Sequence, residues 1–325
     1  MNPSGSVKDR AAVNMVDLAM RSGMIKRGDV VCEATGGNTG VSLALVSASQ
    51  GFRTILCMTA GVSKEKQDLM RLYGAEIVLC PPGNSSHQKC LDQPLTRLLP
   101  GPVRRDGVLN PTNYRVTAER IANEKGGVYT NQFDNVANFL AHYNGTGPEI
   151  YIQSRGKVDA FVCASGTGGT ISGVSNFLKD TNPAIKIFLA DCDGSALASK
   201  VLTGKLELFG SGSFAEGIGN SMITGNHGRA VIDDAVRVRY CEQSSAFVHF
   251  CVMNDILQHS CMYHFSDKEL LEMGYFLLRN DALFVGPAAA LNACAAVKVA
   301  RKLGPGHNIV TILCDGGDRY ISKVA

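Results

Sequence analysis

Long apolar runs are absent from this chain of 325 residues, and so is a strong excess of charge of either sign. A net charge of +3 gives no reason to expect a nucleic acid or another polyanion as a partner. The short basic run at residues 103–105 is typical of a solvated loop. No apolar segment approaches the roughly 20 residues that a membrane-spanning helix needs. We therefore predict a chain that binds neither nucleic acid nor membrane.

The 11 cysteines include no Cys-x-x-Cys pair. This argues against a structural zinc site and against a thioredoxin-type redox site. Several cysteines lie inside apolar runs, where thiols behave as small hydrophobic side chains; they are Cys32, Cys57, Cys80, Cys163 and Cys314. We therefore predict that the chain has no metal site and belongs to an intracellular, reducing compartment.

Strand-like and helix-like segments alternate along two stretches of the chain. A hydrophobic content of 45% is ample for a buried core, and 35 glycines indicate many tight turns. The expected strands are residues 28–32, 53–58 and 75–80 in the first stretch and 158–163, 184–191, 283–285 and 308–313 in the second. Such alternation is typical of α/β proteins with parallel sheets. We predict a smaller α/β domain over residues 1–128 and a larger one over residues 129–325, with residues 81–111 as a surface excursion.

The most informative lysine lies within the first ten residues. The turn-forming pairs Asn2-Pro3 and Ser4-Gly5 precede Lys8, and apolar residues at helical spacing follow it. Lys8 is therefore expected where a loop enters the N-terminus of an amphipathic helix. The partial positive charge of such a terminus disfavours the ammonium form, and a neutral amine is the form that reacts with an aldehyde cofactor. Taken alone, a lysine beside two charged neighbours is more often a solvated charge.

Two glycine-rich segments each follow an expected strand and open an expected helix. Residues 166–170 read Gly-Thr-Gly-Gly-Thr, and their amides would converge at the positive end of a helix, as a phosphate cradle requires. This segment is neither a Walker loop nor a Gly-x-Gly-x-x-Gly fingerprint. Residues 35–39 offer amides and two hydroxyls to a carboxylate, and a plain turn is the alternative for both segments. With an activated lysine, two anion sites indicate pyridoxal phosphate (PLP) and a substrate that carries a carboxylate.

These segments resemble those of the cysteine synthase and cystathionine β-synthase family, whose fold is shared with the tryptophan synthase β chain. Residues 2–10 match the family's PLP-lysine segment, and residues 33–40 look like its Glu-Pro-Thr-Ser-Gly-Asn-Thr-Gly loop. Residues 166–170 match its phosphate loop, and residues 216–219 are similar to the loop that closes over the substrate. The motifs follow the family's order and cover essentially the whole chain. The resemblance implies the two-domain, parallel-sheet fold of these PLP enzymes.

The resemblance also implies roles for individual residues. Lys8 would form the Schiff base with PLP and act as the catalytic base, and Asn38 would face the ring hydroxyl of the cofactor. The phosphate of PLP would be bound by Gly166, Thr167, Gly168, Gly169 and Thr170. The substrate would be bound by Thr35, Gly36, Gly37, Asn38, Thr39, Gln132 and Gly217.

The sequence departs from the family pattern at several positions. Gly36 replaces a serine, residues 286–289 read Gly-Pro-Ala-Ala instead of Gly-x-Ser-Ser, and Gly316 stands where the family usually places Ser or Thr opposite the pyridine nitrogen. We expect the neighbouring Asp315 to stay solvated beside Arg319, which leaves that nitrogen without a side-chain partner. Relatives also begin a few dozen residues earlier, with strands of the larger domain, and we expect an unpaired sheet face or edge where those strands are missing.

The function that the resemblance implies is β-replacement on an activated serine. O-acetylserine and sulfide would give cysteine and acetate, with PLP as the electron sink. Cystathionine β-synthase or serine/threonine dehydratase activity is the alternative within the family, and a PLP-binding protein with little catalysis is the alternative outside it. The resemblance further implies a homodimer in the cytoplasm or the mitochondrion. Residues 188–191 and 280–286 look closest to the fungal cysteine synthase 2 branch.

Overall fold

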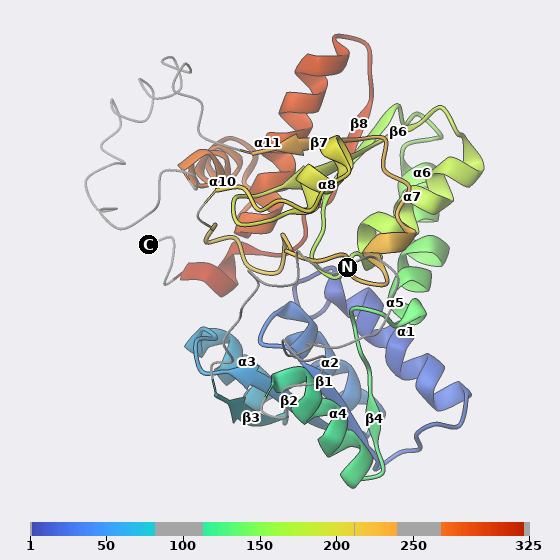
Figure 1. Cartoon of the computed structure of the whole chain (residues 1–325), viewed down its shortest axis with the longest axis vertical. Coiled ribbons are helices and arrows are strands. Elements are labelled where there is room, and N and C mark those ends of the chain that lie inside the picture. Colours follow the sequence, from blue (N-terminus) through green and yellow to red (C-terminus); the bar gives the residue numbers. More distant parts are fainter. Residues whose placement is uncertain (1, 82–112, 211, 239–267, 322–325) are drawn as a thin grey trace. The chain divides into compact units, whose positions relative to one another are not determined.

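The computed structural model describes residues 2–81, 113–210, 212–238 and 268–321, and the chain divides into two compact units (Figure 1). Unit 1 comprises Met1–Gly156, Thr167–Pro183 and Met222–Val231. Unit 2 comprises Lys157–Gly166, Ala184–Ser221 and Ile232–Ala325. The chain therefore passes between the units several times. The predicted domain boundary between residues 128 and 129 stays a prediction; by contacts, residues 129–156 group with unit 1.

Unit 1 is built on a parallel sheet in the order β3-β2-β1-β4. Its strands are β1 (Val30–Ala34), β2 (Arg53–Thr59), β3 (Glu76–Cys80) and β4 (Val128–Tyr129). The register pairs Val30 with Arg53 and Ile55 with Glu76. All five residues of β1 are buried, as expected for a central strand that has helices over both faces.

Helices pack on both faces of this sheet. The helices of unit 1 are α1 (Lys8–Arg21), α2 (Asn38–Gln50), α3 (Lys64–Leu72), α4 (Tyr114–Glu124), α5 (Val136–Ala141), the π-helix η2 (His142–Thr146), α6 (Gly147–Gln153), α7 (Gly169–Thr181) and the short η3 (His227–Arg229). Successive side chains of a strand point to opposite faces. Val31 accordingly packs in a cluster with residues of α1 and α2, and Leu56 packs with residues of α2 and α3. Cys57 faces the other way, into a cluster with α4.

Unit 2 repeats the same strand arrangement. Its strands are β5 (Ala160–Ala164), β6 (Lys186–Asp191), β7 (Asp234–Arg237) and β8 (Ile309–Thr311), in the parallel order β7-β6-β5-β8. Its helices are α8 (Leu197–Thr203), α10 (Lys268–Asp281), α11 (Pro287–Leu303) and the short η5 (Gly317–Tyr320). Val162 and Phe188 pack with Leu291 and Cys294 of α11 in one core cluster. Among the described residues β8 ends the sheet, and its three residues are half-buried.

The predicted α/β class with two parallel sheets is confirmed, but one strand was assigned wrongly. Residues 283–285 do not form a strand of the sheet, because only Val285 makes an isolated bridge, to Gly316. Leu283 and Phe284 are 41% and 43% exposed and merely connect α10 to α11. The fourth strand is β7, which the sequence analysis missed. Nearly all of the excursion predicted at residues 81–111 lies outside the described residues.

The buried cysteines behave as the composition predicts. Cys32, Cys57, Cys80 and Cys163 are buried free thiols, whereas Cys314 is only partly buried. Burial raises the pKa of Cys32 and of Cys57 to about 12, so both stay protonated at neutral pH. Within the described part of the chain, no cluster of His, Cys, Asp and Glu could hold a metal ion, and no helix combines the length and apolarity needed to span a membrane.

We expect the core cluster beneath α3 to dominate the stability of that helix. Met70 is 0% exposed and Leu72, on the same helix, is 78% exposed. Met70→Ala should lower the free energy of unfolding by about 2–5 kcal/mol, because it leaves a cavity. Leu72→Ala, the matched control, should change it by less than about 0.5 kcal/mol. Urea unfolding followed by circular dichroism measures both, and equal losses would contradict this packing.

Candidate active site

Lys8 is the first residue of α1, as the sequence predicts. Asp9, which is buried, holds the loop that precedes it. The Asp9 carboxylate accepts a hydrogen bond from the Ser4 amide at 2.7 Å and another from the Ser4 hydroxyl. Gly5 reverses the loop at a φ of 82°, which glycine adopts without strain. These contacts fix the path of the backbone that carries Lys8.

The loop from Thr35 to Gly37 connects β1 to α2 and presents donors at the start of that helix. Thr35 is buried, and its Oγ1 accepts a hydrogen bond from the Gly37 amide at 3.1 Å. Asn38 and Thr39 lie in the first turn of α2, whose N-cap is Gly37. Amides of a first helical turn have no partner within the helix. The first-turn amides of α2 therefore lie at the positive end of a helix, where a carboxylate could accept from them, and the predicted carboxylate site stays a prediction.

Gly36, where the family pattern has serine, is packed against a side chain. A Cβ at Gly36 would overlap Cγ2 of Val62. A serine at position 36 would therefore require Val62 to move. Val62 therefore occupies the space that a side chain at position 36 would need and presents a methyl group there.

A buried carboxylate ties Gln132 to the strand that precedes this loop. Glu33 is 0% exposed. One carboxylate oxygen accepts hydrogen bonds from the Thr130 hydroxyl at 2.6 Å and from the Gln132 amide at 3.0 Å, and the other accepts one from the Ala34 amide at 2.8 Å. Burial raises the pKa of Glu33, and these hydrogen bonds oppose that rise. The sequence analysis gave Glu33 no role, because its position in a motif does not reveal which loop its carboxylate holds.

The predicted phosphate loop requires glycine for reasons of space. Gly168, the N-cap of α7, has a φ of 92°, and a Cβ there would overlap the backbone of His227. A Cβ at Gly169 would overlap the Asn138 side chain. Thr170 follows in the first turn of α7 and is buried. The residues present fit a phosphate, because the first-turn amides, which have no partner within the helix, lie at the positive end of a 13-residue helix.

Asn138 connects Gln132 to this loop. Its Nδ2 donates to the Gln132 carbonyl oxygen at 2.8 Å and to Thr167 Oγ1 at 3.1 Å. Thr167 is held from the other side by the Thr224 hydroxyl, which donates to its carbonyl oxygen at 2.7 Å. Gln132, which is 4% exposed, therefore lies in a network that runs from the carboxylate loop to the phosphate loop.

His142 connects the phosphate loop to the helix of Lys8, and the sequence analysis missed it. Its Nε2 lies 3.2 Å from Thr170 Oγ1 and its Nδ1 lies 2.9 Å from Thr146 Oγ1. Thr146 Oγ1 also accepts a hydrogen bond from Arg10 of α1 at 3.2 Å. Burial and the charges of Lys8 and Arg10 lower the pKa of His142 to about 3, so its ring is neutral at pH 7. The sequence contains no signal for these contacts, because a lone histidine does not reveal which side chains it will meet in the fold.

The two remaining predicted residues, Gly166 and Gly217, meet within unit 2. A Cβ at Gly166 would overlap the carbonyl oxygen of Gly217, whose φ is 78°. The Gly219 amide also donates to the Ser165 carbonyl oxygen at 2.9 Å. The loop at residues 216–219 therefore lies against the residues that enter the phosphate loop.

Asp315 is 5% exposed, so the expectation that it stays solvated is wrong. The Tyr320 hydroxyl donates to its Oδ2 at 2.6 Å. Arg319 is likewise 5% exposed. The reason is that the chain turns into η5 directly after Gly316 and brings Tyr320 back over the carboxylate. A Cβ at Gly316 would overlap the Asp318 carboxylate.

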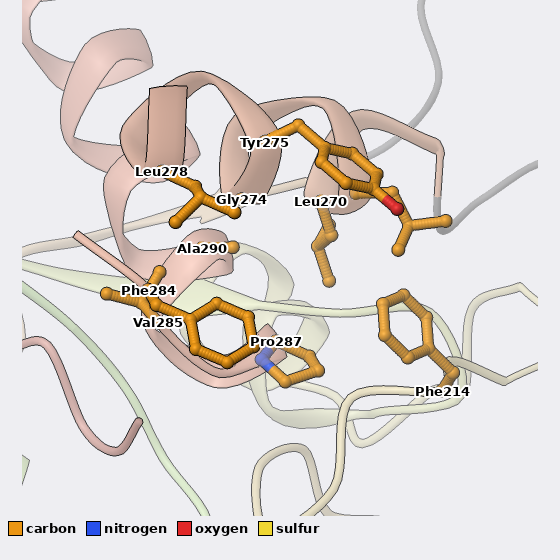
Figure 2. Close-up of a pocket in the computed structure, with 10 residues that line it drawn as sticks. Phe214, Leu270, Gly274, Tyr275, Leu278, Phe284, Val285, Pro287 and Ala290 are labelled. Carbon is orange, nitrogen blue, oxygen red and sulfur yellow. The ribbon is translucent and has the colours of Figure 1, made fainter. Parts of the chain in front are cut away.

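An apolar pocket lies elsewhere in unit 2, between α10 and the start of α11 (Figure 2). The rings of Phe214, Tyr275 and Phe284 surround it, together with Leu270 and Pro287. Its lining residues, all from the described part of the chain, carry no charge. It therefore offers no counter-charge to a carboxylate or a phosphate, and it contains none of the predicted site residues.

The chain belongs to the family of pyridoxal-phosphate dependent enzymes, whose family model matches residues 1–315. The protein is accordingly a PLP-dependent enzyme, and PLP is its cofactor. The predicted cofactor and the predicted fold of two parallel-sheet α/β domains are confirmed.

Its relatives among curated proteins are cysteine synthases. The chain is 38% identical over 334 residues to cysteine synthase of Dictyostelium discoideum, and the match covers 100% of this chain and 75% of that relative. It is 39% identical over 327 residues to cysteine synthase 1 of Neurospora crassa, covering 100% and 74%. It is 36% identical over 346 residues to cysteine synthase 2 of Schizosaccharomyces pombe, covering 100% and 75%. The predicted family resemblance, including its fungal members, is confirmed.

A solved structure supports the same fold. The crystal structure of O-ureido-L-serine synthase matches with a TM-score of 0.75 at 27% sequence identity, covering 99% of this chain and 84% of that chain. The matches to the curated relatives and to this structure extend over essentially the whole chain, so they include every predicted site residue. The role of each of these residues stays a prediction.

We expect Glu33→Gln to destabilise the protein. A side-chain amide would direct its NH₂ group toward at least one of the donors that now bind the carboxylate, and a buried unpaired donor costs about 1–3 kcal/mol. Differential scanning calorimetry should show a lower Tm, and the amide of residue 132 should exchange its hydrogen faster. Glu124→Gln, at an exposed residue of α4, is the control and should leave both unchanged. An unaltered Tm for Glu33→Gln would show that the hydrogen bonds of the Glu33 carboxylate do not stabilise the protein.

We expect the protein to lose stability as the pH falls from 6.5 toward 3. Burial lowers the pKa of His142 to about 3 and that of His227 to about 4, so below pH 6.5 the unfolded chain binds protons that the folded chain does not. Stability is therefore fully present above pH 6.5 and declines below it, by about 2 kcal/mol per histidine at pH 5.

Urea unfolding of His142→Gln at pH 7 and at pH 5 checks this expectation. The variant should lose about 2 kcal/mol less than the wild type between the two pH values. His307→Gln, which alters an exposed histidine, should behave as the wild type does. An identical pH dependence in all three proteins would show that His142 does not contribute.

Proposed function

We propose that this protein makes cysteine and acetate from O-acetylserine and sulfide, with PLP as its cofactor. The observation that carries the proposal is that the lysine loop, the carboxylate loop and residues 167–170 of the phosphate loop belong to one unit and are joined by contacts within it. Ser4 of the lysine loop lies 3.1 Å, Oγ to Oγ, from Ser42 of α2, the helix that the carboxylate loop opens. The networks through His142 and Asn138 join these loops to Thr170 and Thr167.

Each loop has a defined task in this reaction. PLP, when bound, supplies the sink for the electron pair that remains when the α proton of the substrate leaves. Lys8 Nζ would hold the cofactor and take up that proton. Residues 35–39 would bind the substrate carboxylate through the first-turn amides of α2, with Gln132 beside them. Residues 166–170 would bind the phosphate. These roles orient the bond to the leaving acetate so that sulfide can take its place.

A second candidate is a PLP-binding protein with little catalysis. Two observations favour it: Val62 occupies the space of a serine at position 36, and the Asp318 carboxylate occupies the space of a side chain at position 316. Both changes alter groups that the family pattern places near substrate or cofactor. The assay below separates the two candidates, because both bind PLP and only one makes cysteine.

We further propose a homodimer in the cytoplasm or the mitochondrion. The compartment is supported only by a relative from Saccharomyces cerevisiae, 34% identical over 344 residues, whose name contains the word mitochondrial. Analytical ultracentrifugation of the purified protein tests the dimer, and a sedimentation coefficient of a monomer across the accessible concentrations would exclude it.

We expect the wild-type protein to form cysteine from O-acetylserine and sulfide, and Lys8→Ala to lose at least about a thousandfold in rate, because it lacks both the covalent anchor and the proton acceptor. Borohydride treatment should attach PLP irreversibly to the wild type and not to Lys8→Ala, as mass spectrometry can show. Lys26→Ala, at an exposed lysine, is the control for both measurements.

The two measurements discriminate between the candidates. Borohydride-stable PLP without cysteine formation in the wild type would favour the binding protein. PLP that remains attached by borohydride to Lys8→Ala would show that another lysine carries it and would refute the assignment.

A further inference from the structure

We propose that His142 is a positioning residue that turns the hydroxyl of Thr170 into a hydrogen-bond donor for a phosphate monoester dianion. The proposal rests on the proposed function, since it takes residues 166–170 as the site of the PLP phosphate. It adds a residue that lies outside every motif of the sequence and that acts on the ligand only through Thr170.

The geometry is a chain of four polar side chains that runs from α1 to the first turn of α7. Arg10 Nη1 lies 3.2 Å from Thr146 Oγ1, which lies 2.9 Å from His142 Nδ1. His142 Nε2 lies 3.2 Å from Thr170 Oγ1. Thr146, His142 and Thr170 are 5%, 0% and 9% exposed. Water therefore has little access to the chain, and its groups must satisfy one another.

The direction of the hydrogen bonds follows from the donor at one end. An arginine can only donate, so Thr146 Oγ1 accepts from Arg10. If Thr146 then donates to His142 Nδ1, the ring carries its hydrogen on Nε2 and donates to Thr170 Oγ1. In the reverse direction His142 would donate to Thr146, and the Thr146 hydroxyl hydrogen would have no acceptor among its described contacts at a buried position. The first direction leaves instead the hydroxyl hydrogen of Thr170, which a phosphate bound at residues 166–170 would accept.

This direction leaves one hydroxyl hydrogen unused, that of Thr170. The hydrogen belongs to the first turn of α7, where the helix amides point to the same place and a phosphate would accept from all of them. A hydroxyl that accepts from an imidazole N–H also becomes a better donor, because hydrogen bonds in a chain polarise one another. His142 thus prepares Thr170 for an anion without adding a charge of its own.

The surroundings keep the imidazole neutral and in place. Lys8 and Arg10 lie close enough for their charges to disfavour an imidazolium, and Arg10 is paired with Glu149 at 2.7 Å. His142 begins the π-helix η2, a rare element that is often found at functional sites. Gly173 of α7 packs against it so closely that a Cβ at Gly173 would lie 2.6 Å from the His142 Cβ. The ring therefore has little freedom to turn away from Thr170.

The test compares the affinity of the full chain for PLP with its affinity for pyridoxal, which lacks the phosphate, by equilibrium dialysis. His142→Phe should weaken PLP binding by about 5- to 10-fold and leave pyridoxal binding within about twofold, because one hydrogen bond to the phosphate is lost. Thr170→Val should have the same selective effect. The double variant should be no weaker than Thr170→Val alone, since both changes remove one interaction.

Conservative and control variants separate positioning from folding. His142→Gln keeps an N–H near the place of Nε2 and an oxygen that accepts from Thr146, so it should restore PLP affinity to within about twofold of the wild type. Tyr143→Phe, which removes a neighbouring hydroxyl that donates to Asp180, should change neither affinity. If His142→Phe does not fold, Thr146→Val replaces it, because it interrupts the same chain at the preceding link.

The ³¹P NMR shift of bound PLP supplies a readout that a purely structural role would not move. We expect the same change of shift in His142→Phe and Thr170→Val, and none in His142→Gln. Equal weakening of PLP and pyridoxal, or multiplicative effects in the double variant, would refute the relay. A wild-type protein that binds PLP no better than pyridoxal would refute the proposed phosphate site itself, which is a different failure.

Discussion

The chemistry of this protein depends on one geometric constraint: a parallel strand delivers its chain to the N-terminus of a helix. β1 ends at Ala34 and α2 starts at Asn38, and β5 ends at Ala164 and α7 starts at Gly169. At both places the first-turn amides lack partners inside the helix and the helix end carries a partial positive charge. Short, glycine-rich connections join strand and helix at both places. Such helix starts suit anions, and for this reason a carboxylate and a phosphate are the ligands predicted for them.

Buried polar side chains hold these connections in position. Asp9, Glu33 and His142 are each within a few per cent of complete burial, and each is paired with groups on a loop of the candidate site. A buried polar group is costly unless its partners are in place. The loops therefore cannot shift without leaving these groups unpaired, and the same contacts serve stability and the shape of the site.

The departures from the family pattern have a shared physical form. At Gly36 the missing side chain is matched by Val62, and at Gly316 by Asp318, in both cases a neighbour that occupies the space a Cβ would need. At both positions a neighbouring group therefore fills the space of the absent side chain. Beside Gly36, in the carboxylate loop, this group is a methyl group, and beside Gly316 it is a carboxylate. Such changes can alter substrate preference while the fold stays the same.

Much of the fold and part of the site could be read from the amino-acid order. Alternating apolar segments identified the parallel α/β class, and the start of α1 at Lys8 followed from turn residues beside a helical pattern. One cause of the need for glycine at Gly168 is local, the positive φ at the start of α7, whereas the crowding by His227 is not. The local features depend on neighbours in sequence, which a sequence displays directly.

Other features required the tertiary structure, because their causes lie far apart along the chain. Residues 283–285 have a strand-like composition, yet β7 took the fourth place in the sheet, since pairing is decided by which segment can reach the edge of β6. Asp315 is buried because Tyr320 folds back over it. His142 meets Thr170 across 28 positions and Glu33 meets Gln132 across 99. The sequence by itself determined which glycine-rich segments lead from a strand into a helix, and only packing decided which distant side chains hold them in place.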